Sequence, residues 1–519
     1  MLPRTPHPLS APAPLSAPAP LSAPAPRPAR RGRPLLAALS ALLLGACTLG
    51  PDFQRPPAPE ADHYSADRLA TDTVSAAGTS QHLRHGAALP TDWWRGLGSP
   101  ELDDLVDQAL TQNPGLQAAE ASLRRSQANL LAGAGVFYPQ IGLSAASNRE
   151  RSAPQANNST LPSSIFNVST VGLSVGYALD LFGLQRRTVE GLEAQADEQQ
   201  ALARAARLSL VANVVNTSIA RSAYQAQVDT TLALTALQRQ QLALTEAQVR
   251  AGTTAYASLP GLRSQIAGNE ASLEPLRQKR DQAGHLLDSL VSGTPGPQAL
   301  PLIPLQRYAL PGTLPLSLPS ELVRQRPDIL ASEAELHAAS AAVGVATASL
   351  FPSISLNASY GVAGNAFGNL SGPTQRFWSV GPSVNLPLFQ GGSQWYGRQA
   401  ALAGYEQAQG SYRQTVLNAF AQVADCLSAL DHDARALQAS EEARAAAREA
   451  LALSDASYRA GLGAYLDLLA ADIQLHQTEL AWLQAFALRE QDTVALFAAL
   501  GGGWWHASAA AATASEPSP

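Results

Sequence analysis

A 32-residue segment of this chain occurs twice, 213 positions apart, and each copy passes from a helical pattern to a strand pattern. Residues 114–145 align without a gap with residues 327–358, and the identical pairs are Pro114/Pro327, Ala118/Ala331, Glu120/Glu333, Ala121/Ala334, Leu123/Leu336, Ala128/Ala341, Pro139/Pro352, Ile141/Ile354, Leu143/Leu356 and Ala145/Ala358. Each copy begins with Pro, continues for about 22 helix-forming residues and then meets a second Pro, which cannot donate a helical hydrogen bond. Beyond that Pro the hydrophobic period changes from about 3.6 to 2. The sequence therefore predicts a duplicated helix-to-strand unit.

Four segments with an apolar residue at every second position predict strands. The apolar positions are Ile141, Leu143 and Ala145; Val171, Leu173, Val175, Tyr177, Leu179 and Leu181; Ile354, Leu356, Ala358 and Tyr360; and Val380, Val384, Leu386 and Leu388. Each segment is about 10–12 residues long, enough for a tilted strand to cross a bilayer. One such strand alone would favour a half-buried sheet in a soluble sandwich, but two hairpins flanked by long helices favour a membrane barrel. Because a spanning barrel needs about eight strands and lipid tolerates no open edge, several chains must share one barrel.

Two proline-free stretches predict very long helices. No Pro occurs between Gly183 and Leu259 or between Leu388 and Glu516, and both stretches are rich in Ala, Leu, Gln, Arg and Glu. If residues 184–250 and 392–459 each form one helix, each helix is roughly 100 Å long at about 1.5 Å per residue. Helices of this length need a coiled-coil or helical-tube environment. The apolar pattern is rich in Ala, which suits helices packed closely on two sides.

The two long helices end in related turns. Residues 249–266 align with 458–475, and the shared residues within the turns are Arg250, Gly252, Ala255 and Tyr256 in the first and Arg459, Gly461, Ala464 and Tyr465 in the second. A basic last turn followed by Gly is typical of a helix terminus, and we expect positive φ at both Gly. Each Tyr would then begin a return helix. Either turn alone is an ordinary helix end, whereas the matched pair favours a shared docking role.

The N-terminal residues resemble a bacterial export signal. Residues 9–26 repeat LSAPAP three times and have no packing potential. A basic stretch containing Arg30, Arg31 and Arg33 precedes an apolar run at 35–44, and Leu44-Gly45-Ala46-Cys47 resembles a lipobox in which Cys47 becomes the lipidated first residue. The apolar run is too short to span a membrane as a helix. Thr48 after the Cys resembles lipoproteins sent to the outer membrane.

Composition and motif context argue against several other functions. The formal net charge is −6, and removal of residues 1–46, which hold five Arg and no acid, leaves 30 − 41 = −11, which disfavours nucleic-acid binding. Gly172-Leu173-Ser174-Val175-Gly176 matches the nucleophile-elbow pattern, but it lies inside a predicted strand. Asp431-His432-Asp433 is interpreted as a solvated helix face, and Cys426 as a buried thiol without a disulfide partner. We expect no enzymatic activity, no metal and no cofactor.

The order of motifs resembles that of the OprM/NodT-type lipoproteins, which belong to the TolC-like outer-membrane factors of efflux systems. These motifs are Gly50-Pro51-Asp52-Phe53-Gln54-Arg55-Pro56, Asp92-Trp93-Trp94, Leu179-Asp180-Leu181-Phe182-Gly183, Arg326-Pro327-Asp328, Leu386-Pro387-Leu388-Phe389 with Gly391-Gly392, and Ala499-Leu500-Gly501-Gly502-Gly503-Trp504. The resemblance covers about residues 47–505. It implies an α+β membrane protein: a homotrimer whose 12-stranded outer-membrane barrel, four strands per chain, continues as a long periplasmic α-helical barrel.

The resemblance also implies a function and partners. The chain would be the outer-membrane exit channel of a tripartite RND-type efflux pump that confers multidrug resistance, passively conducting drugs or other small toxic compounds. It would dock a periplasmic adaptor (membrane fusion) protein at the two turns and act with an inner-membrane transporter. Beyond the second turn, family members narrow the duct with apolar and acidic side chains: Leu466 matches the apolar position, Ala470 stands where several members carry Asp, and Asp467 and Asp472 are nearby. An outer-membrane duct for type I protein secretion is the alternative function.

These expectations divide the chain into five parts. Residues 1–46 would be a signal peptide with its low-complexity leader, 47–98 a lipidated N-terminal segment, and 506–519 a disordered tail. The first structural repeat would occupy 99–310 with a β-hairpin at about 138–182, and the second 311–505 with a β-hairpin at about 352–390. We expect the protein in the cell outer membrane, lipid-anchored, with a large periplasmic portion.

Overall fold

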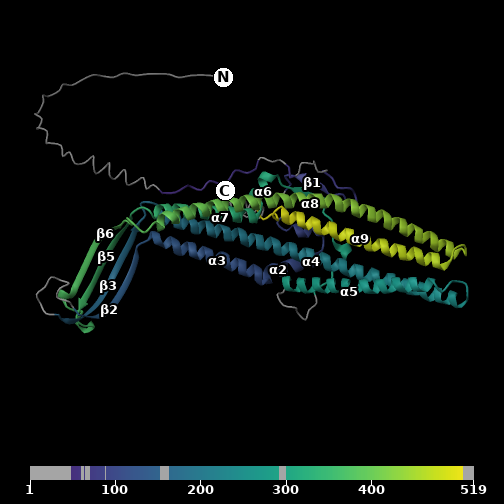
Figure 1. Cartoon of the computed structure of the whole chain (residues 1–519), viewed down its shortest axis with the longest axis horizontal. Coiled ribbons are helices and arrows are strands. Elements are labelled where there is room, and N and C mark those ends of the chain that lie inside the picture. The colour runs from purple at the N-terminus through teal and green to yellow at the C-terminus, as the bar shows by residue number, and fades with distance from the viewer. Residues whose placement is uncertain are drawn as a thin grey trace, which may run out of the picture. The chain divides into compact units, whose positions relative to one another are not determined.

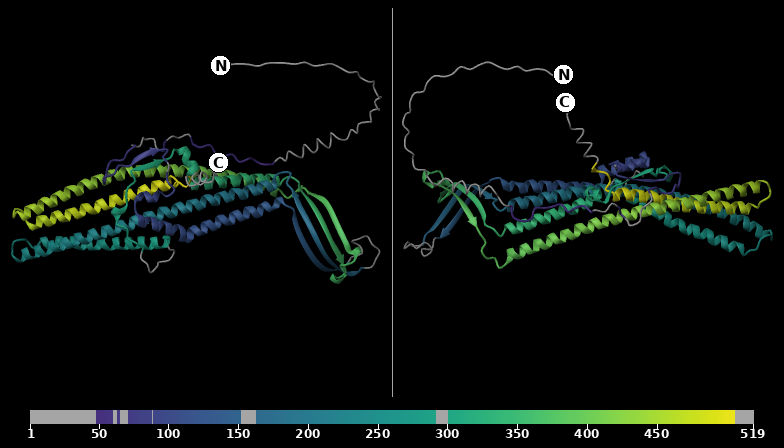
Figure 2. Two further views of the ribbon diagram at one scale, coloured as in Figure 1. Left: turned by 180° about the vertical axis from the view of Figure 1, so that it is seen from behind. Right: turned by 90° about the horizontal axis from the view of Figure 1, so that it is seen from above.

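The computed structural model describes residues 48–59, 63–64, 71–87, 89–151, 163–291 and 300–505. The chain divides into two compact units, Met1–Cys47 and Thr48–Pro519, and the first lies outside the described residues. The predicted signal sequence, Cys47 and the C-terminal tail therefore also lie outside them. Within the second unit, a four-stranded sheet stands at one end of a set of long helices, and two helical turns form the opposite end (Figures 1 and 2).

Each repeat runs through helix, strand, strand, long helix and return helix. The first repeat contains α3 (Pro114–Ala134), β2 (Gln140–Arg151), β3 (Ile165–Leu179), α4 (Leu184–Arg250) and α5 (Ser258–Val291). The second contains α7 (Pro327–Ala348), β5 (Ser353–Gly364), β6 (Arg376–Asn385), α8 (Ser393–Arg459) and α9 (Tyr465–Ala499). Pro114 and Pro327 start their helices, and each strand begins one residue after the second Pro. The predicted helix-to-strand transition is thus confirmed in both copies.

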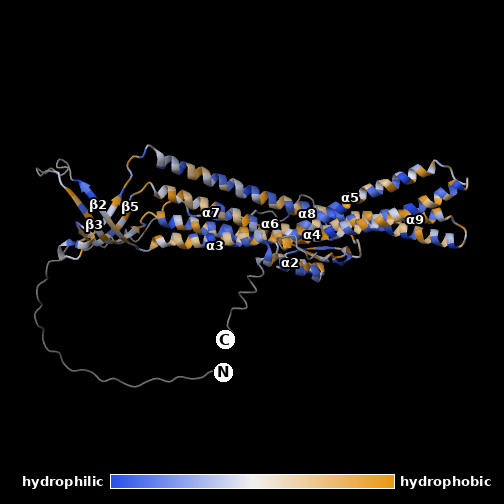
Figure 3. Ribbon diagram, turned by 90° about the horizontal axis from the view of Figure 1, so that it is seen from below, coloured by the Kyte–Doolittle hydropathy of each residue, from blue (hydrophilic) through white to orange (hydrophobic). Residues whose placement is uncertain are grey.

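The two long helices match the predicted ranges to within one residue. Helices α4 and α8 are each 67 residues long, and no Pro interrupts either one. Helix α4 packs against α3, α5, α7 and α9, whereas α8 packs against α7 and α9. Hydrophilic and hydrophobic residues are mixed along the whole length of these helices (Figure 3). Among the described residues, no helix combines the length and the apolar character needed to cross a bilayer.

The four strands form one antiparallel sheet in the order β2-β3-β5-β6. The two hairpins are therefore neighbours, and β3 pairs with β5 across the repeat boundary, for example Val171 opposite Val362. Strand β3 has 15 residues and is longer than predicted because the pairing with β2 continues to Ile165 opposite Arg151. Strand β6 ends at Asn385, so the alternation predicted through Leu386 and Leu388 runs beyond the strand. Both outer edges of the sheet are unpaired in the single chain.

A smaller layer surrounds the middle of the helices. It contains β1 (His82–His85), which pairs in parallel with β4 (Thr313–Leu316), the short helices α2 (Pro100–Gln112) and α6 (Pro319–Gln325), and the 3₁₀ helices η1 (Trp93–Leu97) and η4 (Leu305–Arg307). Two more 3₁₀ turns, η5 (Phe367–Asn369) and η6 (Pro373–Gln375), lie between β5 and β6, and η2 (Gly135–Phe137) joins α3 to β2. The main apolar core lies beneath this layer, where Trp93 and Trp94 pack with Phe497 of α9 among fully buried Leu and Val.

Candidate functional site: a two-faced sheet and two helical tips

The alternation of the strands gives the sheet two chemically different faces. One cross-strand row of the apolar face is Leu143, Leu173, Tyr360 and Trp378. The opposite face carries Ser and Asn side chains that bond across the strands: Ser355 Oγ lies 2.7 Å from Ser383 Oγ, and Ser359 Oγ 2.8 Å from Ser379 Oγ. An apolar face suits contact with lipid and a hydroxyl-lined face suits water. The sheet therefore has the two faces of a barrel wall.

The nucleophile-elbow pattern lies inside this wall. Ser174 is in the middle of β3, and its hydroxyl donates a hydrogen bond to the carbonyl of Gly142 on β2 at 3.3 Å. A nucleophile elbow requires a strand-to-helix turn at the Ser, and β3 continues to Leu179. The sequence pattern thus reflects strand alternation with small residues on the wet face. Gly172 of the same pattern faces Gly361 across the ladder, and the Phe377 ring packs over both.

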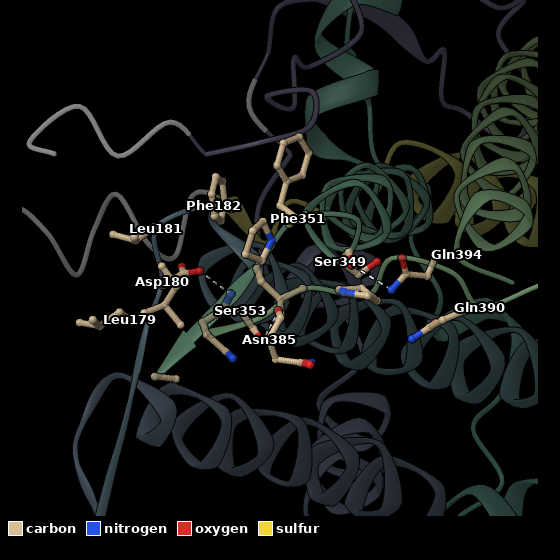
Figure 4. A pocket seen from close by; sticks show the side chains of 17 residues that line it. Leu179, Asp180, Leu181, Phe182, Ser349, Phe351, Ser353, Asn385, Gln390 and Gln394 are labelled. Atoms are coloured by element: carbon tan, nitrogen blue, oxygen red, sulfur yellow. Dashed lines mark hydrogen bonds between the residues drawn. The ribbon is translucent and has the colours of Figure 1, made fainter. Parts of the chain in front are cut away.

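A cavity of about 250 Å³ lies where the sheet joins the helices (Figure 4). Its polar wall includes Ser353, Asn385, Gln390 and Gln394, and the Gln394 amide donates a hydrogen bond to the carbonyl of Ser349. Its apolar wall includes the stacked rings of Phe182 and Phe351, whose centroids are 5.1 Å apart. Among the residues that line this cavity, Asp180 is the one with an ionisable side chain.

Asp180 shapes the start of α4. Its carboxylate accepts hydrogen bonds from the backbone N–H groups of Gln185 and Arg186 at 3.1 and 2.9 Å. An anion in this place satisfies N–H groups that have no partner within the helix and interacts favourably with the helix dipole. The Asp180-to-Gly183 part of the Leu-Asp-Leu-Phe-Gly motif is therefore a strand-to-helix joint.

The N-terminal motif forms a strap along the base of the sheet and the upper helices. Leu49 N–H donates to the Phe182 carbonyl at 3.1 Å, and Asp52 pairs with the buried Arg187 of α4 at 2.6 Å. Farther along, the Phe53 ring stacks on His337 of α7 at 4.3 Å. The described chain thus begins beside the membrane sheet, where Thr48 contacts Gly183. Sequence reasoning identified the motif but not this role.

Both long helices end in the same hydrogen-bonded turn. At the first tip, Gly252 N–H donates to the Val249 carbonyl and Thr253 N–H to that of Gln248, each at 3.0 Å. At the second tip, Gly461 N–H donates to the Tyr458 carbonyl and Leu462 N–H to the Ser457 carbonyl, each at 2.9 Å. This is the Schellman arrangement, which requires a left-handed residue after the helix.

The tip glycines have φ angles of +75° and +71°, as predicted for Gly252 and Gly461. A Cβ on either one would meet no atom within 4 Å, so these positions require Gly for its backbone conformation and not for space. Tyr465 starts α9 as predicted, whereas α5 starts at Ser258, two residues after Tyr256. The Tyr465 ring lies 5.4 Å from that of Tyr458 and braces the second tip, while Tyr256 is 66% exposed. Arg250 and Arg459 end the two long helices, and Ala255 and Ala464 lie in the turns.

The four candidate aperture residues lie at the start of α9. Asp467 accepts a hydrogen bond from the backbone N–H of Ala464 at 3.3 Å, so it caps the helix. Asp472 lies 3.8 Å from His476 on the same helix. Ala470 is exposed and Leu466 is half-buried.

Charged groups are buried where α9 meets the middle layer. Arg489 is fully buried, and its guanidinium donates to the carbonyls of Ala76 and Thr79 and to the side chains of Thr73 and Gln81 at 3.1–3.3 Å. The next residue, Glu490, is also fully buried, and neither carboxyl oxygen has a hydrogen-bond partner within the described structure. Burial raises the pKa of Glu490 to about 8. The available sequence signal was the polar run Arg489 to Thr493, which interrupts two apolar stretches of α9.

The interpretation of Asp431-His432-Asp433 as a solvated face is partly wrong. His432 is exposed, and Asp431 pairs with Arg435 at 2.8 Å. Asp433 instead faces α9, where burial and the neighbouring carboxyl of Asp492 raise its pKa to about 7. Cys426 is half-buried, and burial raises the pKa of its thiol to about 11.

Comparisons with known proteins agree with this architecture. A family model described as outer membrane efflux protein matches residues 105–293 and 318–502. The outer membrane protein OprJ of Pseudomonas aeruginosa is 33% identical over 473 residues, covering 90% of this chain and 95% of OprJ. The cation efflux system protein CusC of Escherichia coli is 27% identical over 473 residues, covering 91% and 98% of the two chains.

Solved structures show the same fold. The structure of the outer-membrane channel OprN superposes with a TM-score of 0.77 at 29% identity and covers 88% of this chain and all of that chain. The open state of the Neisseria gonorrhoeae MtrE outer membrane channel gives 0.74 at 27% identity, covering 88% and 98%. In the trimeric channels of this fold, three four-stranded sheets supply 3 × 4 = 12 strands to one barrel above a helical tunnel. By sequence over most of its length and by fold, the chain belongs to the outer membrane efflux protein family.

Proposed function

We propose that this protein is the exit channel of a tripartite efflux pump, passively conducting drugs or other small toxic compounds from the periplasm to the outside. One observation carries the proposal: the same unit has a two-faced membrane sheet at one end and two matching helical tips at the other, joined by 67-residue helices. Such helices span about 100 Å, so one trimer reaches from the outer membrane deep into the periplasm. A passive duct needs no catalytic group.

The tips are the proposed docking sites for a periplasmic adaptor protein, which in turn contacts an inner-membrane RND-type transporter. Two features support this assignment. The turns repeat the same Arg, Gly, Ala and Tyr residues, and the bulky side chains there are exposed, with Leu462 at 86% and Tyr256 at 66%. A helix end that serves only as a terminator has no need for exposed apolar bulk.

The proposed periplasmic aperture lies one to two turns beyond the second tip. Leu466, Ala470 and Asp472 occupy the first two turns of α9 and supply one apolar, one small and one acidic side chain. Asp467 is a weaker candidate because its carboxylate already caps α9.

A lipid anchor at Cys47 is also proposed. Thr48, the next residue, contacts Gly183 at the base of the membrane sheet, where an acyl chain on Cys47 would be near the bilayer. The variant Cys47→Ser should lose radiolabelled palmitate but still insert, because the strands supply most of the membrane affinity and one lipid signal adds modestly. Palmitate that still enters the Cys47→Ser protein would contradict the assignment.

The channel function is tested with the purified trimer in planar bilayers and with the gene in a strain that lacks its own exit duct. We expect stable ion conductance and restored drug export in the presence of the cognate adaptor and transporter. A trimer that never conducts, or a monomer that conducts alone, would overturn the proposal. Restored secretion of a protein substrate instead of drug export would favour a type I secretion duct.

A further inference from the structure

The outer end of the membrane sheet is basic, although the protein as a whole is acidic. Three Arg occur there, Arg149 and Arg151 at the end of β2 and Arg376 at the start of β6. No Asp or Glu occurs in residues 151–179 or 353–405. The acidic residue at the outer end of the sheet is therefore Glu150. A chain with a formal net charge of −6 thus has three cations and one anion where its strands reach the hairpin loops. We call Arg149, Arg151 and Arg376 the outer arginine cluster.

The strand register places the whole cluster on the lipid-facing side. Arg149 and Arg151 have the same parity as Ile141 and Leu143, and successive residues of a strand alternate between faces. Arg376 is two residues before Trp378, which lies in the apolar row with Tyr360. Glu150 has the opposite parity and belongs to the wet face. The carboxylate is therefore on the other side of the wall from the guanidinium groups.

Closure of the trimeric barrel concentrates the cluster. Strands β2 and β6 are the two edges of the sheet in one chain, so β6 of each subunit pairs with β2 of the next. Arg376 begins β6 and Arg149 and Arg151 end β2, all at the sheet end away from the helices. Each of the three subunit seams therefore brings three Arg side chains together on the outer surface.

None of these three side chains has an ion-pair partner among the described residues, and all three are exposed. The Arg151 guanidinium donates a hydrogen bond to the hydroxyl of Ser163 at 3.4 Å. Like charges gathered at the edge of an apolar band repel one another unless an anion lies between them. Guanidinium groups bind phosphate in a two-point geometry that ammonium groups lack.

We propose that the outer arginine cluster binds the phosphate groups of a glycolipid in the outer leaflet of the outer membrane. The cluster lies beyond the apolar row of Leu143, Tyr360 and Trp378, at the level where lipid headgroups begin. Aromatic residues such as Trp378 anchor a barrel at this boundary, and the cluster adds charge recognition directly beside them. The glycolipid bridges two subunits and stabilises each seam. This inference concerns the membrane rim and is independent of cargo transport.

The test is binding of purified trimer to rough-type lipopolysaccharide, measured by native mass spectrometry and titration. Each change Arg149→Gln, Arg151→Gln or Arg376→Gln should weaken binding about fivefold, and the triple variant about 100-fold. Glu150→Gln on the wet face and Arg124→Gln on α3 are matched controls that should leave binding unchanged. Arg149→Lys should recover part of the loss, because charge remains but two-point geometry does not.

Two further arms identify the occupant. Enzymatically dephosphorylated lipopolysaccharide should bind the native trimer as weakly as intact lipopolysaccharide binds the triple variant. Inorganic phosphate at the same phosphate concentration should not displace the glycolipid. Binding within twofold of native for the triple variant as an intact trimer would overturn the proposal, as would equal binding of the dephosphorylated lipid or full displacement by inorganic phosphate. If the triple variant does not assemble, the three single variants decide with the same criteria.

Discussion

Replacement of Gly461 separates a docking role of the second tip from a purely structural one. Gly461 has a φ of +71°, and its N–H donates a hydrogen bond to the Tyr458 carbonyl at 2.9 Å. A Cβ at this position would meet no atom within 4 Å. A substitution therefore costs backbone strain but no steric clash. That strain is about 1 kcal/mol for Ala and less for Asn, which tolerates the left-handed region. Glu adds repulsion from the carboxyl end of α8, about 0.3–1 kcal/mol.

These costs are local because the tip is far from the parts that assemble the barrel. The sum for Gly461→Glu is about 2 kcal/mol at most, enough to fray the last turn of α8. The membrane sheet begins about 100 Å away by helix rise, so trimer formation and insertion should be unaffected. We expect Gly461→Asn to behave as the native protein, Gly461→Ala to be mildly impaired, and Gly461→Glu to lose adaptor contact and efflux. Gly252→Glu should do the same at the first tip.

The assay scores each variant for heat-resistant trimer yield, cross-linking to the adaptor and drug accumulation. Normal cross-linking and normal efflux of Gly461→Glu at full yield would refute the docking role. A fall in yield that matches the fall in efflux would show that the Gly only terminates the helix. Equal defects in Gly461→Ala and Gly461→Glu would assign the effect to backbone conformation and exclude charge or bulk.

Three further substitutions test the buried structure. The carboxyl of Glu490 has a pKa of about 8 in the folded chain and its ordinary value of 4.5 in the unfolded chain. The folding stability that depends on the protonated carboxyl is therefore complete below about pH 4.5 and lost as pH rises through about 8. Because Gln cannot ionise, Glu490→Gln should show a smaller drop in melting temperature between about pH 5 and about pH 9 than the native protein, and an unchanged drop would contradict this reasoning. Gly361→Ala should block trimer assembly, since its Cβ would lie about 2.5–2.8 Å from backbone atoms of β3, whereas Gly381→Ala on β6, with open space, should assemble normally. Arg489→Met should destabilise the chain by about 3–5 kcal/mol, because four acceptors of the 73–81 segment lose their donor; denaturation within 1 kcal/mol of native would disprove this.

Features determined by local periodicity were predictable from the sequence. The ends of α4 and α8 follow from Gly183, Gly392 and the Arg-Ala-Gly turns, since each signal is contained within a few residues. The strand faces follow from period-2 alternation, because successive residues of a strand point to opposite faces of the sheet. The sharing of one barrel by several chains required one further physical step, that an open sheet edge is not tolerated in lipid.

Features that depend on distant contacts were not predictable. Arg187 lies 135 residues from Asp52, and Arg489 lies more than 400 residues from its acceptors. No local pattern marks such pairs. The error at Asp433 has the same origin: a charged helical residue is usually solvated, and only the position of α9 shows that this carboxyl faces another one.

The duplicated helices differ in how they are stabilised, which links folding of the second hairpin to assembly. Helices α4 and α8 have equal length, but α4 is covered on more sides and α8 has no buried residue before Ala408. Leu417 and Leu453 of α8 remain more than 60% exposed in the single chain. The first turns of α8 have no fully buried residue and contact their own subunit mainly through α7, so neighbouring subunits must supply the rest of the packing surface. We therefore infer that α4 completes its core within the monomer, whereas the part of α8 before Ala408 acquires a full packing surface only when the trimer closes.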